Sequence, residues 1–177
     1  SIIFGSCVGE KGKVLAFEPN PVTFETLSKN AELNPQFNIT PYNLACTLEN
    51  KKYTFHYTDP EQHGNGTNGG YFDGIDYGDH VKKFHSTPIE VTGVNILDFL
   101  NENYLFELDK IKFIKTDTEG FDKEVLKTLA PLIKKNRPVL MVEAFKALSK
   151  EEIVDFYDTL KSFEYEIYDV SPLDNKT

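Results

Sequence analysis

The sequence has few of the residues that build metal clusters, disulfide frameworks or membrane spans. Its 177 residues include only two cysteines, Cys7 and Cys46, and no tryptophan. Two cysteines are too few for a zinc cluster or a disulfide framework. We interpret both as buried free thiols of a reducing compartment, which predicts a cytoplasmic protein. No stretch approaches the roughly 20 consecutive apolar residues of a transmembrane helix, so no membrane partner is expected.

Basic residues are also scarce relative to acidic ones. Lysines and arginines number 19 against 28 aspartates and glutamates, which gives a formal net charge of -9. Such a chain makes a poor generic nucleic-acid binder, because that binding depends on lysines and arginines that neutralise phosphates. The four histidines show no metal-ligand spacing on a single element. Length and composition suit one globular domain over residues 1–177.

The stretch of residues 111–129, IKFIKTDTEGFDKEVLKTL, carries the clearest functional signal. Its first part, residues 111–117, predicts a short strand, and apolar residues at helical spacing predict a helix directly after it. The turn between them contains Asp117, Glu119 and Gly120. In α/β folds ligands bind at such turns, outside the carboxyl ends of parallel strands. Alternatively, the two acids have no chemical role and only stabilise the helix, because carboxylates are favourable near the positive end of its dipole.

The beginning of the chain predicts alternating helices and strands. Residues 1–8 have the pattern of the end of an apolar helix. Residues 13–18 predict an apolar strand that ends in Glu18, and Asn20 followed by Pro21 predicts the start of the next helix. This alternation favours a βαβ architecture.

The middle of the chain predicts weaker strands and one long loop. Residues 38–47 predict an edge strand, because a proline within them cannot donate a ladder hydrogen bond. Residues 53–58 alternate aromatic and polar side chains, which predicts an antiparallel strand paired back to residues 38–47 through residues 49–52. Residues 59–80 contain six glycines. They predict a long mobile loop that either closes over a substrate or is only a solvated surface loop.

The rest of the chain continues this pattern. Residues 89–95 predict a strand, and residues 96–105 predict a short helix capped by Asn95. The nearly continuous apolar run 138–145 predicts a strand buried on both faces. A capping box marks the start of the helix that follows, and residues 165–170 predict a last strand.

Three of these strands end in an acid, namely Glu18, Asp117 and Glu143. If the strands are parallel, the three carboxylates lie along one edge of the sheet, where the crevice of an α/β fold opens. A carboxylate in the position of Glu18 can accept hydrogen bonds from both ribose hydroxyls of NAD or of S-adenosylmethionine. The glycine-rich turn that precedes such an acid by about 20 residues would fall just before Ser1.

Four segments, in this order, resemble the FkbM-type methyltransferases: GKVLAFEPNPVTFETLSKN, VTGVNILDFL, IKFIKTDTEGFDKEVLKTL and RPVLMVEAF. The resemblance covers nearly the whole chain. Its specific parts are the EPN element and the D-x-E-G turn, with Asp122 at the second position after the glycine. It implies a class I S-adenosylmethionine-dependent enzyme, most often one that methylates a hydroxyl of a sugar or small natural product. The implied fold is a Rossmann-like α/β sheet, mostly parallel, with an antiparallel strand at its end.

The resemblance also implies roles for individual residues. Glu18 would hold the ribose hydroxyls of the cofactor, and Pro19 would lie against its adenine. The end of the third strand, near Ala45, would close the adenine pocket. Asp117 would lie near the sulfonium and the acceptor, whose in-line approach makes positioning a large part of the rate.

Methylation of an alcohol also requires removal of its proton. Asp117, Glu119 or Glu143 could act as the general base. Alternatively, Asp117 and Glu143 hold a Mg²⁺ ion that lowers the pKa of the acceptor. A purely structural use is open as well, in which Glu119 and Glu143 cap a helix or pair with Arg137.

Two other functions compete with that of a small-molecule O-methyltransferase. An NAD-binding Rossmann oxidoreductase would also place Glu18 on a ribose. A catalytically inactive methyltransferase-like module would keep the fold and serve only as a binding domain.

The cofactor loop D-x-G-x-x-x-G of the family has no counterpart in this sequence. Class I methyltransferases place their first strand between the strands expected here at residues 13–18 and 111–117. We therefore expect the sequence to be N-terminally truncated, with an open slot between these two strands. We also expect it to be marginally stable on its own and not to bind S-adenosylmethionine measurably.

Overall fold

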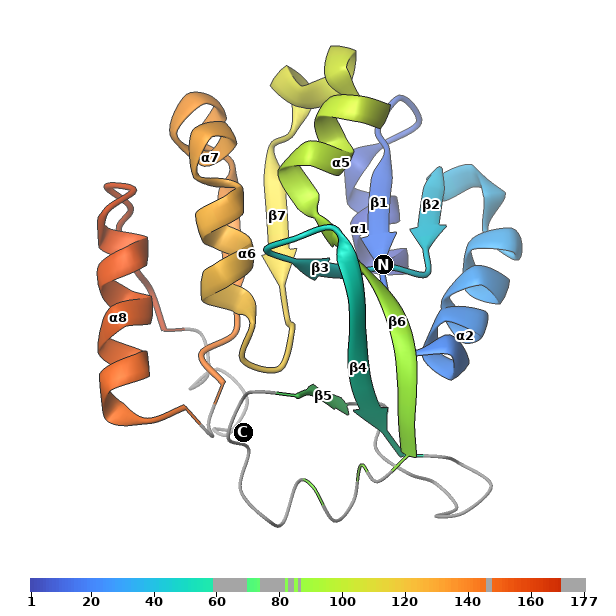
Figure 1. Ribbon diagram of the computed structural model, residues 1–177. Coiled ribbons are helices and arrows are strands. Elements are labelled where there is room, and N and C mark those ends of the chain that lie inside the picture. Colours follow the sequence, from blue (N-terminus) through green and yellow to red (C-terminus); the bar gives the residue numbers. More distant parts are fainter. Residues whose placement is uncertain (59–69, 74–81, 83–84, 86, 146–147, 170–177) are drawn as a thin grey trace, which may run out of the picture.

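The computed structural model shows a mixed α/β protein (Figure 1). It describes residues 1–58, 70–73, 82, 85, 87–145 and 148–169. Within this part of the chain, the strands form three separate hydrogen-bonded groups.

The first group is a βαβ unit made of β1 (Val14–Phe17), α2 (Pro21–Glu32) and β2 (Ile39–Tyr42). The two strands are parallel, as the alternating pattern predicts. The Asn20 side chain caps α2, and Pro21 supplies the fixed φ of the first helical position.

Two short elements flank this unit. Helix α1 (Ile2–Val8) ends at Gly9, whose φ of 72° confirms the predicted end of a helix. The 3₁₀ helix η1 (Pro35–Phe37) precedes β2. A Cβ atom on Gly5 would lie 2.5 Å from the Cβ of Phe37, so the missing side chain at Gly5 lets α1 approach η1 closely.

The second group contains β7 (Phe113–Thr116) and β8 (Val139–Val142), which are parallel. Two helices connect them, α6 (Asp122–Thr128) and α7 (Ala130–Asn136), and the sequence predicted only the first. Helix α8 (Lys150–Lys161) follows β8. These three helices lie on one side of the molecule, and α2 lies on the opposite side (Figure 1).

The third group contains β3 (Ala45–Thr47), β4 (Lys51–Tyr57), β5 (Gly70–Phe72) and β6 (Thr87–Asn95), in the order β3-β6-β4-β5. Strands β3 and β6 are parallel, whereas β4 is antiparallel to both of its neighbours. The strands of the protein are therefore mixed in direction rather than mostly parallel. Helix α5 (Ile96–Asn103) begins directly after β6.

The predicted helix caps in this half of the chain are present. Asn95 caps α5, and Ser149 and Glu152 form the capping box of α8. The 3₁₀ helix η2 (Leu105–Lys110) follows α5. The three predicted strands that end in acids are all present as β1, β7 and β8, each shortened at its ends.

Strands β1 and β7 each pair on one side only within the described residues. Both lie near α1, because α1 packs against β1 and its Phe4 ring lies 5.0 Å from the ring of Phe113 in β7. The open edge expected beside each of these strands is therefore present. The prediction that β1, β7 and β8 are interior strands of one sheet is not met in the part of the chain that the structure describes.

Three predictions about strands are wrong. Residues 38–47 form two strands in different groups, β2 and β3, rather than one. Strand β4 pairs with β5 and β6 instead of pairing back to residues 38–47. Residues 165–169 are irregular, although a strand was predicted over residues 165–170, and residue 170 lies outside the described residues.

Most of the predicted loop 59–80 lies outside the described residues. Within it, Gly70–Phe72 form β5, so this part of the loop prediction is wrong. The prediction of buried thiols is also wrong for Cys7, which is exposed, whereas Cys46 is half-buried. Among the described residues, none of the helices has the length and apolar character of a membrane span.

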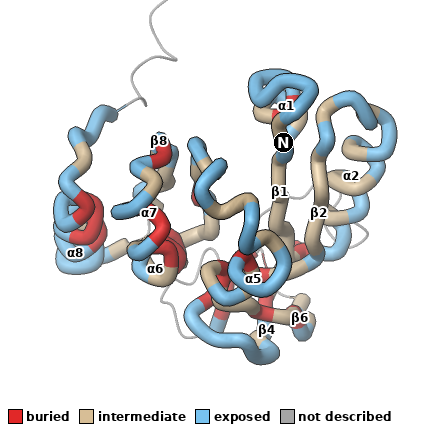
Figure 2. Tube along the Cα trace, turned by 90° about the horizontal axis from the view of Figure 1, so that it is seen from above, coloured by how far each residue is buried: buried red, intermediate tan, exposed pale blue. Residues whose placement is uncertain are grey.

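Buried apolar side chains form two clusters. The larger one includes the fully buried Leu126 and Ile133 and joins α5, α6, α7 and α8 to the inner face of β7 and β8. The smaller one contains Ala45, Phe55 and Phe72 of the mixed group of strands. In Figure 2 buried residues appear in α6, α7 and α8 and around α5, β4 and β6, whereas α2 contributes none.

Candidate functional site

The three predicted acids lie at the carboxyl ends of parallel strands. Glu18 follows β1, Asp117 follows β7 and Glu143 follows β8. Thr116 and Val142 are the last paired residues of β7 and β8, so Asp117 and Glu143 leave the two strands next to each other. The carboxyl groups of Asp117 and Glu143 are hydrogen-bonded to each other.

The turn after β7 has an unusual backbone. Glu119 has a φ of 53° and Gly120 a φ of 100°. Positive φ is rare for a residue with a side chain and costs roughly 1–3 kcal/mol. The N–H of Phe121 donates to the carbonyl of Thr118 over 3.3 Å, and the N–H of Thr118 donates to Oδ2 of Asp122 over 3.3 Å. These two bonds hold the strained turn that leads from β7 into α6.

The EPN element after β1 is held in a different way. Oε1 of Glu18 accepts a hydrogen bond from the N–H of Asn20 over 2.8 Å. Nδ2 of Asn43 donates to the carbonyls of Glu18 and Pro19, over 2.9 and 3.2 Å. Sequence analysis did not single out Asn43, because its bonds reach across the fold and leave no local pattern.

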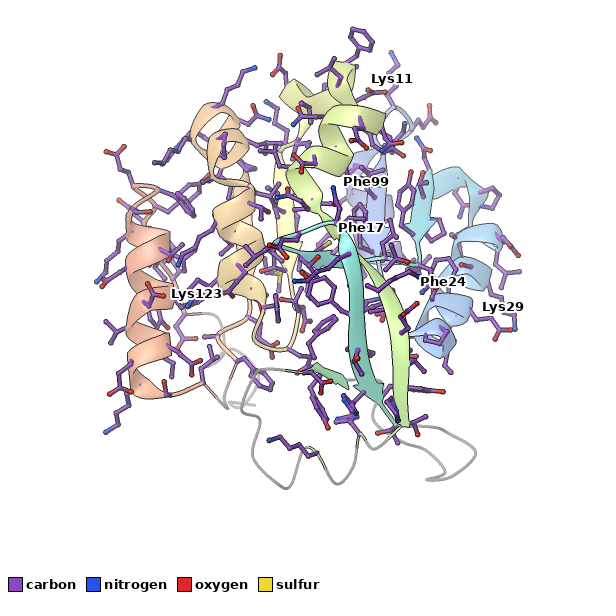
Figure 3. The ribbon with its side chains drawn as sticks, in the orientation of Figure 1. Lys11, Phe17, Phe24, Lys29, Phe99 and Lys123 are labelled. Carbon is purple, nitrogen blue, oxygen red and sulfur yellow. The ribbon has the colours of Figure 1, made fainter. Side chains whose placement is uncertain are left out.

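An aromatic cluster supports the end of β1. The Phe17 ring stacks on Tyr42 at 5.2 Å and meets the edge of Phe99 at 5.4 Å. The Tyr42 hydroxyl is hydrogen-bonded to that of Tyr104. Figure 3 shows Phe17 and Phe99 close together between β1 and α5. This packing fixes the strand end from which Glu18 projects.

Burial raises the pKa of Glu18 from its ordinary value of 4.5 to about 7. The hydrogen bond from Asn20 acts in the opposite direction, and the negative charge of Asp117 raises the pKa further. The effect of Asp117 shows that Glu18 belongs to the same group of acids. The ionised carboxylate of Glu18 has few hydrogen-bond donors around it. Two hydroxyl groups of a ligand would supply such donors and stabilise the ionised form.

The two paired carboxyl groups differ in acidity. Burial raises the pKa of Glu143 to about 7, together with the hydrogen bond and charge of Asp117 and the charges of Glu119 and Asp122. Burial also acts to raise the pKa of Asp117. Hydrogen bonds with Lys115, at 2.5 Å, and with Glu143 outweigh it, so that the pKa of Asp117 is lowered. Of the two groups, Glu143 therefore has the higher pKa.

Glu119 lies on the strained turn and adds to the negative potential of the group. Burial raises its pKa, and the charges of Asp117 and Asp122 raise it further. Arg137 does not pair with it or with Glu143, because its guanidinium donates to the backbone carbonyls at the end of α8. The structural alternative based on Arg137 is therefore wrong.

The two residues expected at the adenine lie in different surroundings. Pro19 is half-buried and directly follows Glu18. Ala45 is only 1% exposed, and its side chain packs in the smaller cluster with Phe55 and Phe72. Only the backbone of Ala45 could therefore line a cofactor site.

The described residues contain no group of three or more histidine, cysteine, aspartate or glutamate side chains arranged to hold a metal ion. Asp117 and Glu143, the predicted metal ligands, are hydrogen-bonded to each other, and the Mg²⁺ alternative stays a prediction. Asp122 is a further member of the site to which the sequence gave no role. It is 2% exposed, and its Oδ1 has no hydrogen-bond partner in the described part of the chain.

Comparison with protein families gives one match. The family model of the methyltransferase FkbM domain matches residues 5–167, which includes every acid of this site. Comparison with curated proteins and comparison with solved structures each gave no match.

Proposed function

The chain belongs to the FkbM methyltransferase family, and we propose that it transfers a methyl group from S-adenosylmethionine to a hydroxyl of a sugar or another small molecule. The observation that carries this proposal is the hydrogen-bonded pair of Asp117 and Glu143 at adjacent strand ends, with Glu18 in the same acidic group. The family membership favours this function over an NAD-dependent oxidoreductase.

The residues around Glu18 fit the cofactor's ribose. Only the Oε1 atom of Glu18 has a described hydrogen bond, from Asn20, and the carboxyl group is half-buried. Two ribose hydroxyls would supply the donors that its ionised form requires. Asn43 holds Glu18 and Pro19 in place for this contact. S-adenosylmethionine, when bound, supplies an electrophilic methyl group.

Glu143 has the properties of a general base. Its pKa of about 7 matches the range in which a carboxylate is both ionised near neutral pH and basic enough to take a proton. Its Oε2 atom is buried and has no hydrogen-bond partner among the described residues. We assign to this atom the proton of the acceptor hydroxyl.

Asp117 has a positioning and electrostatic role in this mechanism. Lys115 and Glu143 keep its pKa low, so it stays ionised. Its charge and hydrogen bond raise the basicity of Glu143. An ionised carboxylate at this strand end also favours the positive charge of a sulfonium. These steps are written with the protein's own groups, and dependence on Mg²⁺ stays a prediction.

A ligand screen with the full-length protein tests the proposed function. S-adenosylmethionine and its demethylated product should each raise the melting temperature, whereas NAD should not, since only a bound ligand stabilises the folded state. A panel of sugars and small alcohols should then show acceptor-dependent formation of the demethylated product. Stabilisation by NAD alone would contradict the proposal. Cofactor binding without product from any acceptor would favour the inactive binding module.

A further inference from the structure

A pocket of about 270 Å³ lies beside the acidic pair, on the side of α6 and α8. Glu143 belongs to its wall, so the pocket adjoins the proposed general base. Apolar side chains form much of the remaining wall: Leu48, Phe121, Leu148 and Phe156. The pocket thus combines apolar side chains with polar groups that can fix the orientation of a small molecule.

The charged residues of this wall are predominantly acidic. They are Asp122, Lys123, Glu124, Glu143 and Glu152. Lys123, which Figure 3 shows on the α8 side of α6, is already engaged by Asp155 at 2.7 Å and by Glu124 at 3.5 Å. Oε2 of Glu152 accepts the backbone N–H of Ser149 in the capping box of α8.

Asp122 and Glu143 each have a buried carboxyl oxygen without a hydrogen-bond partner in the described part of the chain. Oδ2 of Asp122 accepts the N–H of Thr118, but its Oδ1 has no partner. Oε2 of Glu143 also has none. Buried carboxylate oxygens without donors are costly, so each is satisfied when a ligand brings a donor or a positive charge.

We propose that this pocket binds a protonated amine of the acceptor through Asp122, so that the substrates are amino sugars and related hydroxyl-bearing amines. The inference rests on the proposed function, because it places the acceptor hydroxyl at Glu143 and the amine at Asp122. In this binding mode the amine donates a hydrogen bond to Oδ1 of Asp122. A neutral hydroxyl donates a hydrogen bond to the same oxygen but brings no charge into an acidic pocket.

Ligand-observed NMR titrations with the full-length protein, without cofactor, test this inference. The probes are glucosamine, galactosamine and mannosamine, each compared with glucose, galactose or mannose as its neutral counterpart. At least one amine should bind about tenfold more tightly than its neutral counterpart. Equal binding within all three pairs would overturn the inference, as would the absence of binding by every amine.

Asp122→Asn keeps the shape of the side chain and removes its charge. It should abolish most of the amine preference, whereas the matched control Asp109→Asn should keep it, because Asp109 is exposed and pairs with Lys135 far from the pocket wall. If Asp122→Asn does not fold, Asp122→Ser serves in its place, because it also removes the charge and keeps an oxygen that can accept the N–H of Thr118. An amine preference that survives these substitutions would also overturn the inference.

S-adenosylmethionine binding is measured separately on the same protein. Failure of the wild-type protein to bind the cofactor contradicts the proposed function. Absence of an amine preference in the wild-type protein, with cofactor binding intact, contradicts this inference alone.

Discussion

Asp117 and Glu143 follow the last paired residues of two neighbouring parallel strands, and their carboxyl groups share a hydrogen bond. Lysine contact lowers the pKa of Asp117, whereas burial and the neighbouring acid raise the pKa of Glu143 to about 7. Two acids whose environments separate their pKa values in this way can take different roles in one reaction.

The first prediction concerns the pH dependence of turnover. Glu143 must be ionised to act as a base, so activity should be lost as the pH falls below about 7. In Glu143→Gln, turnover should fall by about a hundredfold or more, the contribution of a general base. The pH profile of turnover with saturating substrates measures both effects. A profile that is flat across this range would remove Glu143 from the role of base.

The second prediction separates Asp117 from Glu143. In Asp117→Asn, the negative charge that raises the pKa of Glu143 is lost, so the midpoint of the residual activity should move to lower pH. Turnover should fall strongly while the fold is retained, because Asn keeps the size of the side chain. If EDTA abolishes wild-type activity and Mg²⁺ restores it, the metal alternative is correct. If Asp117→Asn keeps full activity and the midpoint of its pH profile is unchanged, Asp117 neither raises the pKa of Glu143 nor binds a metal ion.

The third prediction concerns stability and Glu18. The pKa of Glu18 is about 7 in the folded protein and near 4.5 when unfolded. The folded state therefore binds the proton more tightly, and this group makes stability fall as the pH rises from about 4.5 through 7. Glu18→Gln removes the ionisation and should raise the melting temperature above that of wild type at about pH 8, but not at about pH 4.

Glu25→Gln is the control for this comparison. Glu25 is exposed and pairs with Lys29, which lowers its pKa, so the substitution should not raise the melting temperature at alkaline pH. Thermal unfolding of the wild type and of both variants, monitored at both pH values, measures these differences in melting temperature. Equal melting temperatures of wild type and Glu18→Gln at the higher pH would show that burial of the ionised Glu18 side chain does not destabilise the folded protein.

The fourth prediction concerns the open edges of β1 and β7. Val14 and Glu18 donate their N–H groups to the β2 side, so Leu15 and Phe17 direct theirs to the other side, because alternate residues of a strand face opposite neighbours. In this chain, the amides of Leu15 and Phe17 should exchange hydrogen faster than that of Ala16. Hydrogen exchange resolved by NMR measures this directly. Equal protection of all three amides would show that a partner covers the edge.

The sequence was sufficient to locate the acidic pair. An apolar run that ends in an acid marks the carboxyl end of a strand, and this pattern occurs before both Asp117 and Glu143. The prediction that the strand before Glu143 is buried on both faces is wrong, because Val139 and Met141 are exposed. Helix starts were equally accessible, because caps such as Asn20 and Asn95 act within three residues of their own position.

Strand pairing was less accessible. The short turn before β4 resembles a hairpin, but β6 lies between β3 and β4. Asn95 at the end of β6 bonds to Asn50 and to the carbonyl of Leu48, which ties that turn to a strand far along the chain. Contacts of this range leave no local periodicity. The prediction of a strand over residues 165–170 failed for a similar reason, because the Tyr165 ring packs on Arg137, which lies far away in the sequence.

The most direct test of the central claim is the calorimetric titration of S-adenosylmethionine into the full-length protein and its Glu18→Ala variant. Losing a buried, charged hydrogen-bond partner costs roughly 1.5–3 kcal/mol, so the affinity of the variant should fall about ten- to a hundredfold. The exposed control Glu25→Ala should bind as wild type does. Unchanged affinity in Glu18→Ala, or no binding of the cofactor by wild type, would contradict the account.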